Sequence, residues 1–354
     1  ISGILVDRFG PKKVMFLGIL AWSAACIGGG LSTNMEQFAF FRGLLGLAEP
    51  TIFAGQIVAV TVWFEKRQRA TANSLCTAGG SIGTVVAPIV IAWLSTIFPW
   101  NDVFVLAGAI GILIAIVWMA VYADPPKEIL DVTLSESAAN RHHGKAFTWG
   151  GLWKTRTLWG VLLIRFVSDP VWYFCLFWLP GYLQEDSGLT LIQVGWVGWI
   201  PFLFGAVGGV LTSAWSDKMV RRGMDPLRAR KRMMTLVAVA APLCIFTPYF
   251  NALPPYWNVA AIIASFSLIA IMCLSWLYTI CVVIAEAFPV KNVASVVGIT
   301  AGAGAVGGAV FNIFIGSLLV TMGNVLFAVM GVMHLVTAVI LWRMVRHETP
   351  KTVK

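Results

Sequence analysis

The sequence predicts an all-α, polytopic membrane protein, and three observations support this fold class. Of the 354 residues, 58% are hydrophobic and only 12% are charged, whereas soluble domains carry about 25% charged residues. The mean hydropathy is +0.83. The apolar residues form continuous runs of about 20, unlike the short alternating segments of a transmembrane β-barrel. This composition excludes a disordered chain, a coiled coil, a secreted disulfide scaffold and a nucleic-acid-binding domain.

Ten apolar runs are long enough to cross a hydrocarbon core of about 30 Å as helices. They cover about residues 14–32, 37–62, 71–97, 103–122, 158–183, 191–215, 233–250, 257–285, 294–320 and 325–342. Residues 1–6 are typical of the end of a further helix. We therefore expect that the chain begins inside a helix and lacks what precedes it.

Lysine and arginine predict the orientation of these spans. When the connections are assigned alternately to two sides, every Lys and Arg outside a span falls on the same side, and only Arg42 and Arg165 lie inside spans. Cytoplasmic loops carry such an excess of positive charge. The net charge of +9 is therefore expected to reside in cytoplasmic loops, with the lipid bilayer as a partner and no nucleic acid.

The six cysteines and four histidines show no metal-binding spacing. The cysteines stand singly in apolar runs, as small buried side chains do. We expect no metal and no cofactor. We also expect no enzyme, because a membrane-embedded enzyme would need clustered His, Asp or Cys side chains.

One long polar connection, residues 123–157, divides the chain into an N-terminal helical bundle (1–122) and a C-terminal helical bundle (158–345), followed by a tail (346–354). The two halves share sequence. An Asp followed by a basic cluster occurs at Asp7 and again at Asp217, and Thr-Ala-Gly occurs at 77–79 and at 300–302. These echoes indicate duplicated halves related by an axis along the membrane normal.

Three segments resemble a known family. The pattern Gly3-x-Leu5-x-Asp7-Arg8-x-Gly10-x-Lys12-Lys13 resembles the signature loop between helices 2 and 3 of the major facilitator superfamily. Residues 41–49 resemble helix 4 of its anion:cation symporter branch, and residues 168–183 are similar to helix 7 of bacterial hexuronate transporters. The resemblance implies the major facilitator fold, two six-helix bundles of which the first here lacks helix 1 and most of helix 2, in a bacterial inner (plasma) membrane.

The resemblance also implies that the loops at Asp7 and Asp217 latch a cytoplasmic gate. The alternative is an ordinary solvated turn. Helix 5 and helix 11 carry small residues that let helices approach closely and slide. The expected gating residues are Gly3, Asp7, Arg8, Gly10, Lys12, Lys13, Pro88, Asp217, Arg221 and Arg222.

Charged side chains inside spans are costly, roughly 2.5–3.5 kcal/mol each at the bilayer centre, so few persist without a use. Arg42 and Glu49 are seven residues apart and share one helix face, about 10 Å apart along the axis. We expect Arg42 to bind a substrate carboxylate or to act on Glu49, and Glu49 to exchange the proton. The alternative is a structural polar contact between helices.

Arg165 and Asp169 are four residues apart, so they can pair directly across one helical turn. We expect Arg165 to bind substrate and Asp169 to take part in proton coupling, with a kink at Pro170 beside them. The alternative is a purely structural ion pair that neutralises itself, which is the less costly way to bury both charges.

Further polar and aromatic residues inside spans are candidate substrate contacts. Trp172 and Tyr173 suit the C–H faces of a sugar ring, whereas Trp178 and Tyr182 are interpreted as an aromatic belt at the membrane interface. Gln56 and Asn312 either contact substrate or join helices by hydrogen bonds.

These residues, together with the resemblance, predict a proton-coupled symporter that takes up an organic anion by alternating access, with a hexuronate or aldonate sugar acid as the expected substrate. Its expected partners are a small organic anion and a proton, and we expect a monomer. The alternatives are a symporter for another carboxylate, aromatic or dicarboxylic, and a transport-inactive membrane sensor.

Overall fold

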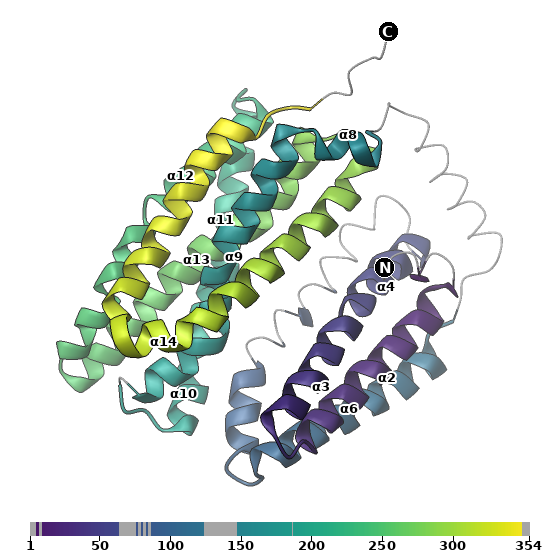
Figure 1. The fold of residues 1–354 in the computed structure, drawn as a ribbon, viewed down its shortest axis with the longest axis vertical. Coiled ribbons are helices and arrows are strands. Elements are labelled where there is room, and N and C mark those ends of the chain that lie inside the picture. The colour runs from purple at the N-terminus through teal and green to yellow at the C-terminus, as the bar shows by residue number, and fades with distance from the viewer. Residues whose placement is uncertain are drawn as a thin grey trace. The chain divides into compact units, whose positions relative to one another are not determined.

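A computed structural model describes residues 5–6, 9–63, 76, 79–80, 83, 86–123, 147–185 and 187–348. Every regular element within these ranges is helical, which confirms the predicted fold class. The chain divides into two compact units, Ile1–His142 and His143–Lys354. In Figure 1 the first unit runs from purple to blue and the second from teal to yellow.

The first unit is organised around α2 (Pro11–Gly30), which packs against α3 (Met35–Ala48), α4 (Pro50–Trp63) and α6 (Trp100–Val121). Close approach of α2 and α6 depends on glycine: a Cβ at Gly108 would lie 2.7 Å from the Ser23 carbonyl oxygen. Two hydrogen bonds join the ends of the pair, from Asn101 Nδ2 to the Gly30 carbonyl (2.9 Å) and from Trp118 Nε1 to the Lys12 carbonyl (3.1 Å).

The apolar run 37–62 is interrupted in the structure. α3 ends at Ala48, Glu49 follows as its C-cap, and α4 begins at Pro50. Proline has no N–H to donate and its ring crowds the carbonyl one turn earlier, which explains a break at this point. The run 71–97 is helical over 86–94, and most of its remainder lies outside the described residues.

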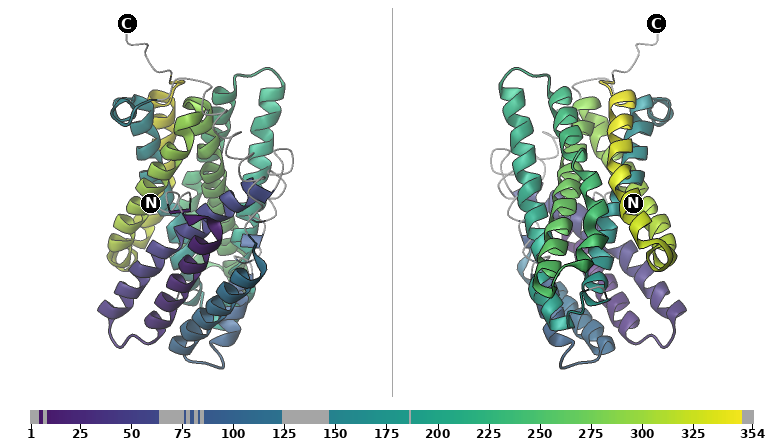
Figure 2. Two further views of the ribbon diagram at one scale, coloured as in Figure 1. Left: turned by 90° about the vertical axis from the view of Figure 1, so that its right-hand side faces the viewer. Right: turned by 90° about the vertical axis from the view of Figure 1, so that its left-hand side faces the viewer.

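The second unit contains α8 (Trp149–Trp153), α9 (Arg156–Glu185), α10 (Leu191–Val197), α11 (Ile200–Arg221), α12 (Pro226–Ala238), the 3₁₀ helix η1 (Ala241–Ala252), α13 (Pro255–Ala287) and α14 (Val290–Met344). α14 is bent back on itself, and Figure 2 shows the long helices of this unit running side by side. α9 packs against both α13 and α14.

The core of the second unit is aromatic. Phe174 of α9 stacks near Phe266 of α13 (ring centroids 6.0 Å apart) and meets Phe327 of α14 edge-on (5.7 Å). All three rings are fully buried. Burying side chains of this size contributes most of the packing energy available to a helix bundle. This core fixes α9 and α14 next to each other.

Eight helical segments of the described residues are long and apolar enough to cross a membrane. They are Pro11–Gly30, Trp100–Val121, Arg156–Glu185, Leu191–Arg221, Pro226–Ala252, Pro255–Ala287, Ser295–Ile315 and Val325–Met344. Each coincides with one of the ten predicted runs. The protein is therefore a multi-pass membrane protein.

Candidate functional site

A buried ion pair lies in the middle of α9. Arg165 Nη2 is 2.9 Å from Asp169 Oδ2, and the two side chains are 12% and 9% exposed. Ser168 Oγ donates a hydrogen bond to Asp169 Oδ1 (3.2 Å). The four-residue spacing in the sequence therefore does bring the two charges together, as expected.

The Arg165 guanidinium retains an unused donor. Its Nε is buried and has no hydrogen-bond partner among the described residues. A buried donor without a partner costs free energy, on the order of 1–3 kcal/mol and more for a charged group. A carboxylate oxygen could satisfy this donor only if α14 moves away from it, because a Cβ at Gly304 would lie 3.3 Å from Arg165 Nε.

Glycines of α14 make room for this pair. A Cβ at Gly304 would overlap Asp169 Oδ2 and lie 2.8 Å from Asp169 Cγ. A Cβ at Gly307 would overlap the Phe166 carbonyl oxygen, and one at Gly308 would overlap the Tyr173 ring. The predicted small residues of this helix therefore let the α14 backbone approach the charged face of α9 directly.

Replacing Gly304 with alanine is expected to destabilise the protein by about 1–3 kcal/mol, because the added methyl group must displace Asp169 or separate α14 from α9. Gly302→Ala is the matched control: it lies two residues earlier in α14, and no atom of a described residue outside its own helix lies within 4 Å of its added Cβ. The control is expected to be neutral or to stabilise the protein by up to roughly 1 kcal/mol, since alanine favours helix. Thermal unfolding of the two purified variants in detergent measures the difference. Equal unfolding midpoints would contradict the packing described here.

The candidate aromatic residues lie further along α9. Trp172 meets Phe202 of α11 edge-on (5.8 Å), and Tyr173 stacks with Phe177 (6.0 Å) beside Gly308. Both Trp172 and Tyr173 are half-buried. Their role in substrate binding remains a prediction.

Of the two aromatic residues interpreted as an interfacial belt, Tyr182 does not face the membrane, and Trp178 is half-buried. Trp178 Nε1 donates to Asn312 Oδ1 (2.9 Å), and Asn312 Nδ2 donates in turn to the Gly308 carbonyl (2.8 Å). Tyr182 is 5% exposed and packs against Phe266 and Phe327. The belt interpretation of Tyr182 is wrong because its ring belongs to the aromatic core, and Trp178 joins α9 to α14 through Asn312.

The first unit carries Arg42 and Glu49. Both side chains are exposed there, and the Arg42 guanidinium lies over the rings of Phe38 (5.8 Å) and Phe104 (5.6 Å). Cation–π contacts of this kind stabilise a guanidinium. Glu49 stands at the break between α3 and α4, and Gln56 of α4 is half-buried.

Gly3, Asp7 and Arg8 lie outside the described residues. Gly10 precedes α2 with a φ of 80°, a backbone conformation that favours glycine, and Pro11 occupies the first turn of α2. Lys12 is half-buried and Lys13 is exposed. Pro88 lies in the helical segment 86–94. The gating role of these residues stays a prediction.

Asp217, the counterpart of Asp7 in the second half of the chain, forms an ion pair with Arg230. Arg230 of α12 pairs with Asp217 Oδ1 of α11 through Nη1 (2.6 Å) and with Glu286 Oε1 of α13 through Nε (3.3 Å). Arg230 Nη1 also contacts Ser216 Oγ. One guanidinium thus joins the ends of three helices. Arg221 and Arg222, which were also predicted as gating residues, are exposed.

Arg230 was not among the residues predicted from the sequence, although a signal for it exists. It shares a helix face with Leu227 and Met234, which are 4% and 0% exposed. The neighbouring Arg228 and Arg232 lie on the exposed face. A cation on the apolar face of an amphipathic helix points to a buried partner.

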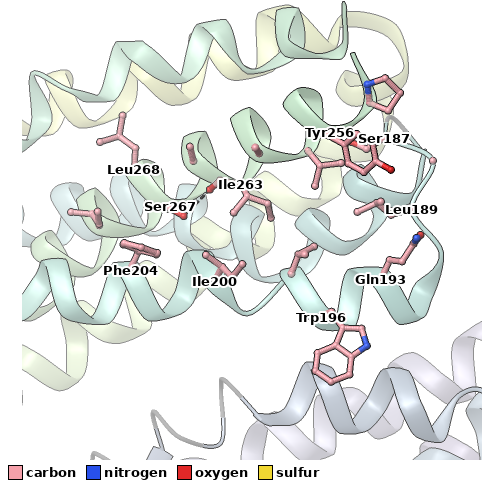
Figure 3. Close-up of a pocket in the computed structure, with 17 residues that line it drawn as sticks. Ser187, Leu189, Gln193, Trp196, Ile200, Phe204, Tyr256, Ile263, Ser267 and Leu268 are labelled. Carbon is pink, nitrogen blue, oxygen red and sulfur yellow. Dashed lines mark hydrogen bonds between the residues drawn. The ribbon is translucent and has the colours of Figure 1, made fainter. Parts of the chain in front are cut away.

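A cavity of about 1060 Å³ lies between α13 and the pair α10 and α11 (Figure 3). Its walls are mainly apolar and include Phe204, Ile263 and Leu268, with Ser187 and Gln193 at one end. None of its lining residues is charged. The cavity is therefore unsuited to holding a carboxylate. Within the described ranges, no group of three or more His, Cys, Asp or Glu side chains could hold a metal ion.

The proteins similar to this chain include transporters named for sugar acids. The chain is 32% identical over 238 residues to the "Probable L-galactonate transporter" of Escherichia coli K12, a match covering 65% of this chain and 52% of that protein. It is 25% identical over 363 aligned positions to the "Hexuronate transporter" of the same strain, covering 98% and 82%. The chain thus spans about half the length of the first of these relatives and four fifths of the second.

A solved structure of a D-xylose-proton symporter matches with a TM-score of 0.74 at 16% identity, covering 99% of this chain and 85% of that one. At this identity the match supports the fold alone. The family model described as "Major Facilitator Superfamily" matches residues 1–282. Because this match covers well over half of the chain, and the helical architecture agrees with it, the protein belongs to the major facilitator superfamily.

Proposed function

We propose that this protein is a secondary transporter of the bacterial inner membrane that takes up a sugar acid together with protons by alternating access. The relatives named for galactonate and hexuronate support the substrate class. Both substrates are polyhydroxylated monocarboxylates, so a binding site needs one cation and several hydrogen-bonding groups.

The buried Arg165–Asp169 pair is the observation on which the proposal rests. Arg165 has a buried Nε that no described residue engages, and Asp169 already accepts from Ser168. When α14 moves away from α9 during the transport cycle, the Arg165 Nε becomes accessible and can donate to a substrate carboxylate. The change in charge balance at Arg165 then lets Asp169 take up or release a proton.

The other proposed contacts follow from position. Trp172 and Tyr173 lie about two turns beyond Arg165 on α9, and Asn312 of α14 carries a primary amide one turn after Gly308. Asn312 uses one acceptor site and one donor in the bonds to Trp178 and Gly308. An amide has two donors and two lone pairs, so it keeps capacity for a sugar hydroxyl. We assign Arg42, Gln56 and Glu49 of the first unit to the same transport cycle, with Glu49 as a second proton carrier.

Transport measurements test this function. Full-length protein in proteoliposomes is given labelled glucuronate, galacturonate or galactonate, with and without an inward proton gradient. We expect accumulation of at least one of the three that is abolished by a protonophore. Unlabelled aromatic acids and sugar diacids compete in parallel, because a symporter for another carboxylate is the alternative.

Two controls sharpen the result. Protein-free liposomes measure leakage, and labelled xylose tests whether a neutral sugar is accepted. Uptake of xylose with no uptake of any sugar acid would contradict an anion site at Arg165. Sugar-acid uptake that is unaffected by the proton gradient would contradict coupling to protons.

A further inference from the structure

Cationic side chains gather at one end of the second unit, where α12 begins and α14 ends. α12 and α14 pack against each other there. The same end is the boundary of two candidate membrane spans, since Pro226–Ala252 starts there and Val325–Met344 finishes there. Side chains at this end are therefore positioned at the level of lipid headgroups.

Trp342 is held in a fixed position at this boundary. Its Nε1 donates to Thr235 Oγ1 of α12 (2.8 Å). The Lys231 ammonium lies 5.4 Å from the centroid of the Trp342 ring, and it also donates to the Val345 carbonyl. The indole thus joins the two helices and remains 43% exposed. Tryptophan is enriched at this depth of a bilayer, where one side of its ring is apolar and the other is wet.

Four exposed arginines lie on the same two helix ends as this indole. Arg228 and Arg232 stand one turn apart on the exposed face of α12, and Arg343 and Arg346 follow Trp342 at the end of α14. We call these five residues the basic patch: Arg228, Arg232, Trp342, Arg343 and Arg346.

The carboxylates near the basic patch are already engaged. Asp225 Oδ1 caps α12 by accepting from the Arg228 N–H (2.8 Å), and Asp225 Oδ2 lies 3.5 Å from His347 Nε2. Glu348 Oε1 accepts from Thr157 Oγ1 (2.7 Å). Arg346 meanwhile acts on Lys231 as a like charge. This excess of positive charge favours an external anion.

Exposed aliphatic side chains continue from the arginines toward the membrane interior. Leu236 of α12 and Val239 at its C-cap follow Arg232 by one and two turns. On α14, Val339 and Val336 precede Arg343 by one and two turns. All four are exposed, between 44% and 63%. An anion that carries hydrocarbon chains can therefore contact both the arginines and these side chains, whereas a soluble anion can contact only the arginines.

We propose that the basic patch binds the phosphodiester headgroup of an anionic phospholipid, with its acyl chains along the exposed faces of α12 and α14. Arginine forks match the paired oxygens of a phosphodiester. Lysine and arginine beside membrane spans attract anionic lipids. This site is separate from the Arg165–Asp169 pair and does not depend on the proposed function.

Native mass spectrometry of the full-length protein in detergent tests the proposal. Phosphatidylglycerol is titrated against phosphatidylcholine with matched acyl chains. We expect phosphatidylglycerol to bind at least tenfold more tightly. In the variant Arg228→Gln/Arg232→Gln this binding is expected to weaken by roughly fivefold per arginine, about 25-fold in total. The matched control Lys154→Gln/Lys218→Gln removes two exposed cations, one at the C-cap of α8 and one on α11, and it is expected to bind as the wild type does.

Two further measurements keep the test decisive. Added salt is expected to weaken phosphatidylglycerol binding to the wild type and to leave phosphatidylcholine binding unchanged. This measurement uses the wild-type protein alone, so it does not depend on whether a variant folds. Inorganic phosphate alone is expected not to displace the lipid. The proposal is overturned if phosphatidylcholine binds equally well, if the control variant weakens binding as much as the arginine variant, or if phosphate displaces phosphatidylglycerol.

Discussion

Replacing Arg165 with methionine is expected to lower the free energy of unfolding by about 3–5 kcal/mol. The substitution leaves the Asp169 carboxylate 9% exposed in a membrane span, with the Ser168 hydroxyl as its remaining described partner. A charge left in such surroundings without a counter-charge carries a large desolvation penalty. Asp169→Asn leaves the Arg165 guanidinium without its counter-charge and is also expected to destabilise the protein.

The double variant Arg165→Met/Asp169→Asn distinguishes the destabilisation caused by one unpaired buried charge from the net contribution of the ion pair to the free energy of unfolding. Because it removes both charges, its stability is expected to return to within roughly 1 kcal/mol of the wild type, as buried ion pairs exchanged for neutral groups often do. Thermal unfolding of the four proteins in detergent completes a double-mutant cycle. Additive losses in the double variant would show that the two side chains do not interact as described.

Replacing Arg230 with methionine is expected to cost roughly 2 kcal/mol and to loosen one end of the second unit. Arg230 joins Asp217 of α11 to Glu286 of α13, so its loss leaves two carboxylates facing each other without their shared cation. The Asp217 side chain is 49% exposed, so screening by solvent reduces its contribution to the loss of stability. Glu286, at 19%, contributes the larger part.

Arg230→Met is also expected to change the relative populations of the conformational states of the transport cycle. If the ends of α11, α12 and α13 are latched in one state of the transport cycle, the variant is expected to populate the other state more. Limited proteolysis at the connection between α11 and α12 measures this, and faster cleavage is expected. Lys218→Met is the control, since Lys218 is an exposed cation beside Asp217. Identical cleavage rates and stabilities in both variants would contradict a latch at Arg230.

The helical spans could be predicted from sequence because each depends on the local hydrophobicity of the chain. A run of about 20 apolar residues is readable without knowledge of neighbours. The interruption between α3 and α4 was also locally encoded, in Pro50, but an apolar run does not by itself show where a helix breaks.

The ion pair of α9 was predictable for the same reason. Arg165 and Asp169 lie on one helix, so their spacing alone fixes their proximity. Arg230 was not found because its partners belong to two other helices, and a list of basic residues does not distinguish a bridging cation from solvated ones. The bond between Trp178 and Asn312 likewise joins residues 134 positions apart.

Uptake of a sugar acid by the Arg165→Met/Asp169→Asn double variant tests the central claim most directly. This protein is expected to fold with nearly wild-type stability, so its transport rate reports on function rather than on folding. If Arg165 binds the carboxylate and Asp169 carries the proton, initial uptake should fall at least about 100-fold, the loss expected when a buried charged contact worth roughly 3 kcal/mol disappears. Uptake within twofold of the wild type, in a variant of equal stability, would show that the pair only holds α9 in place.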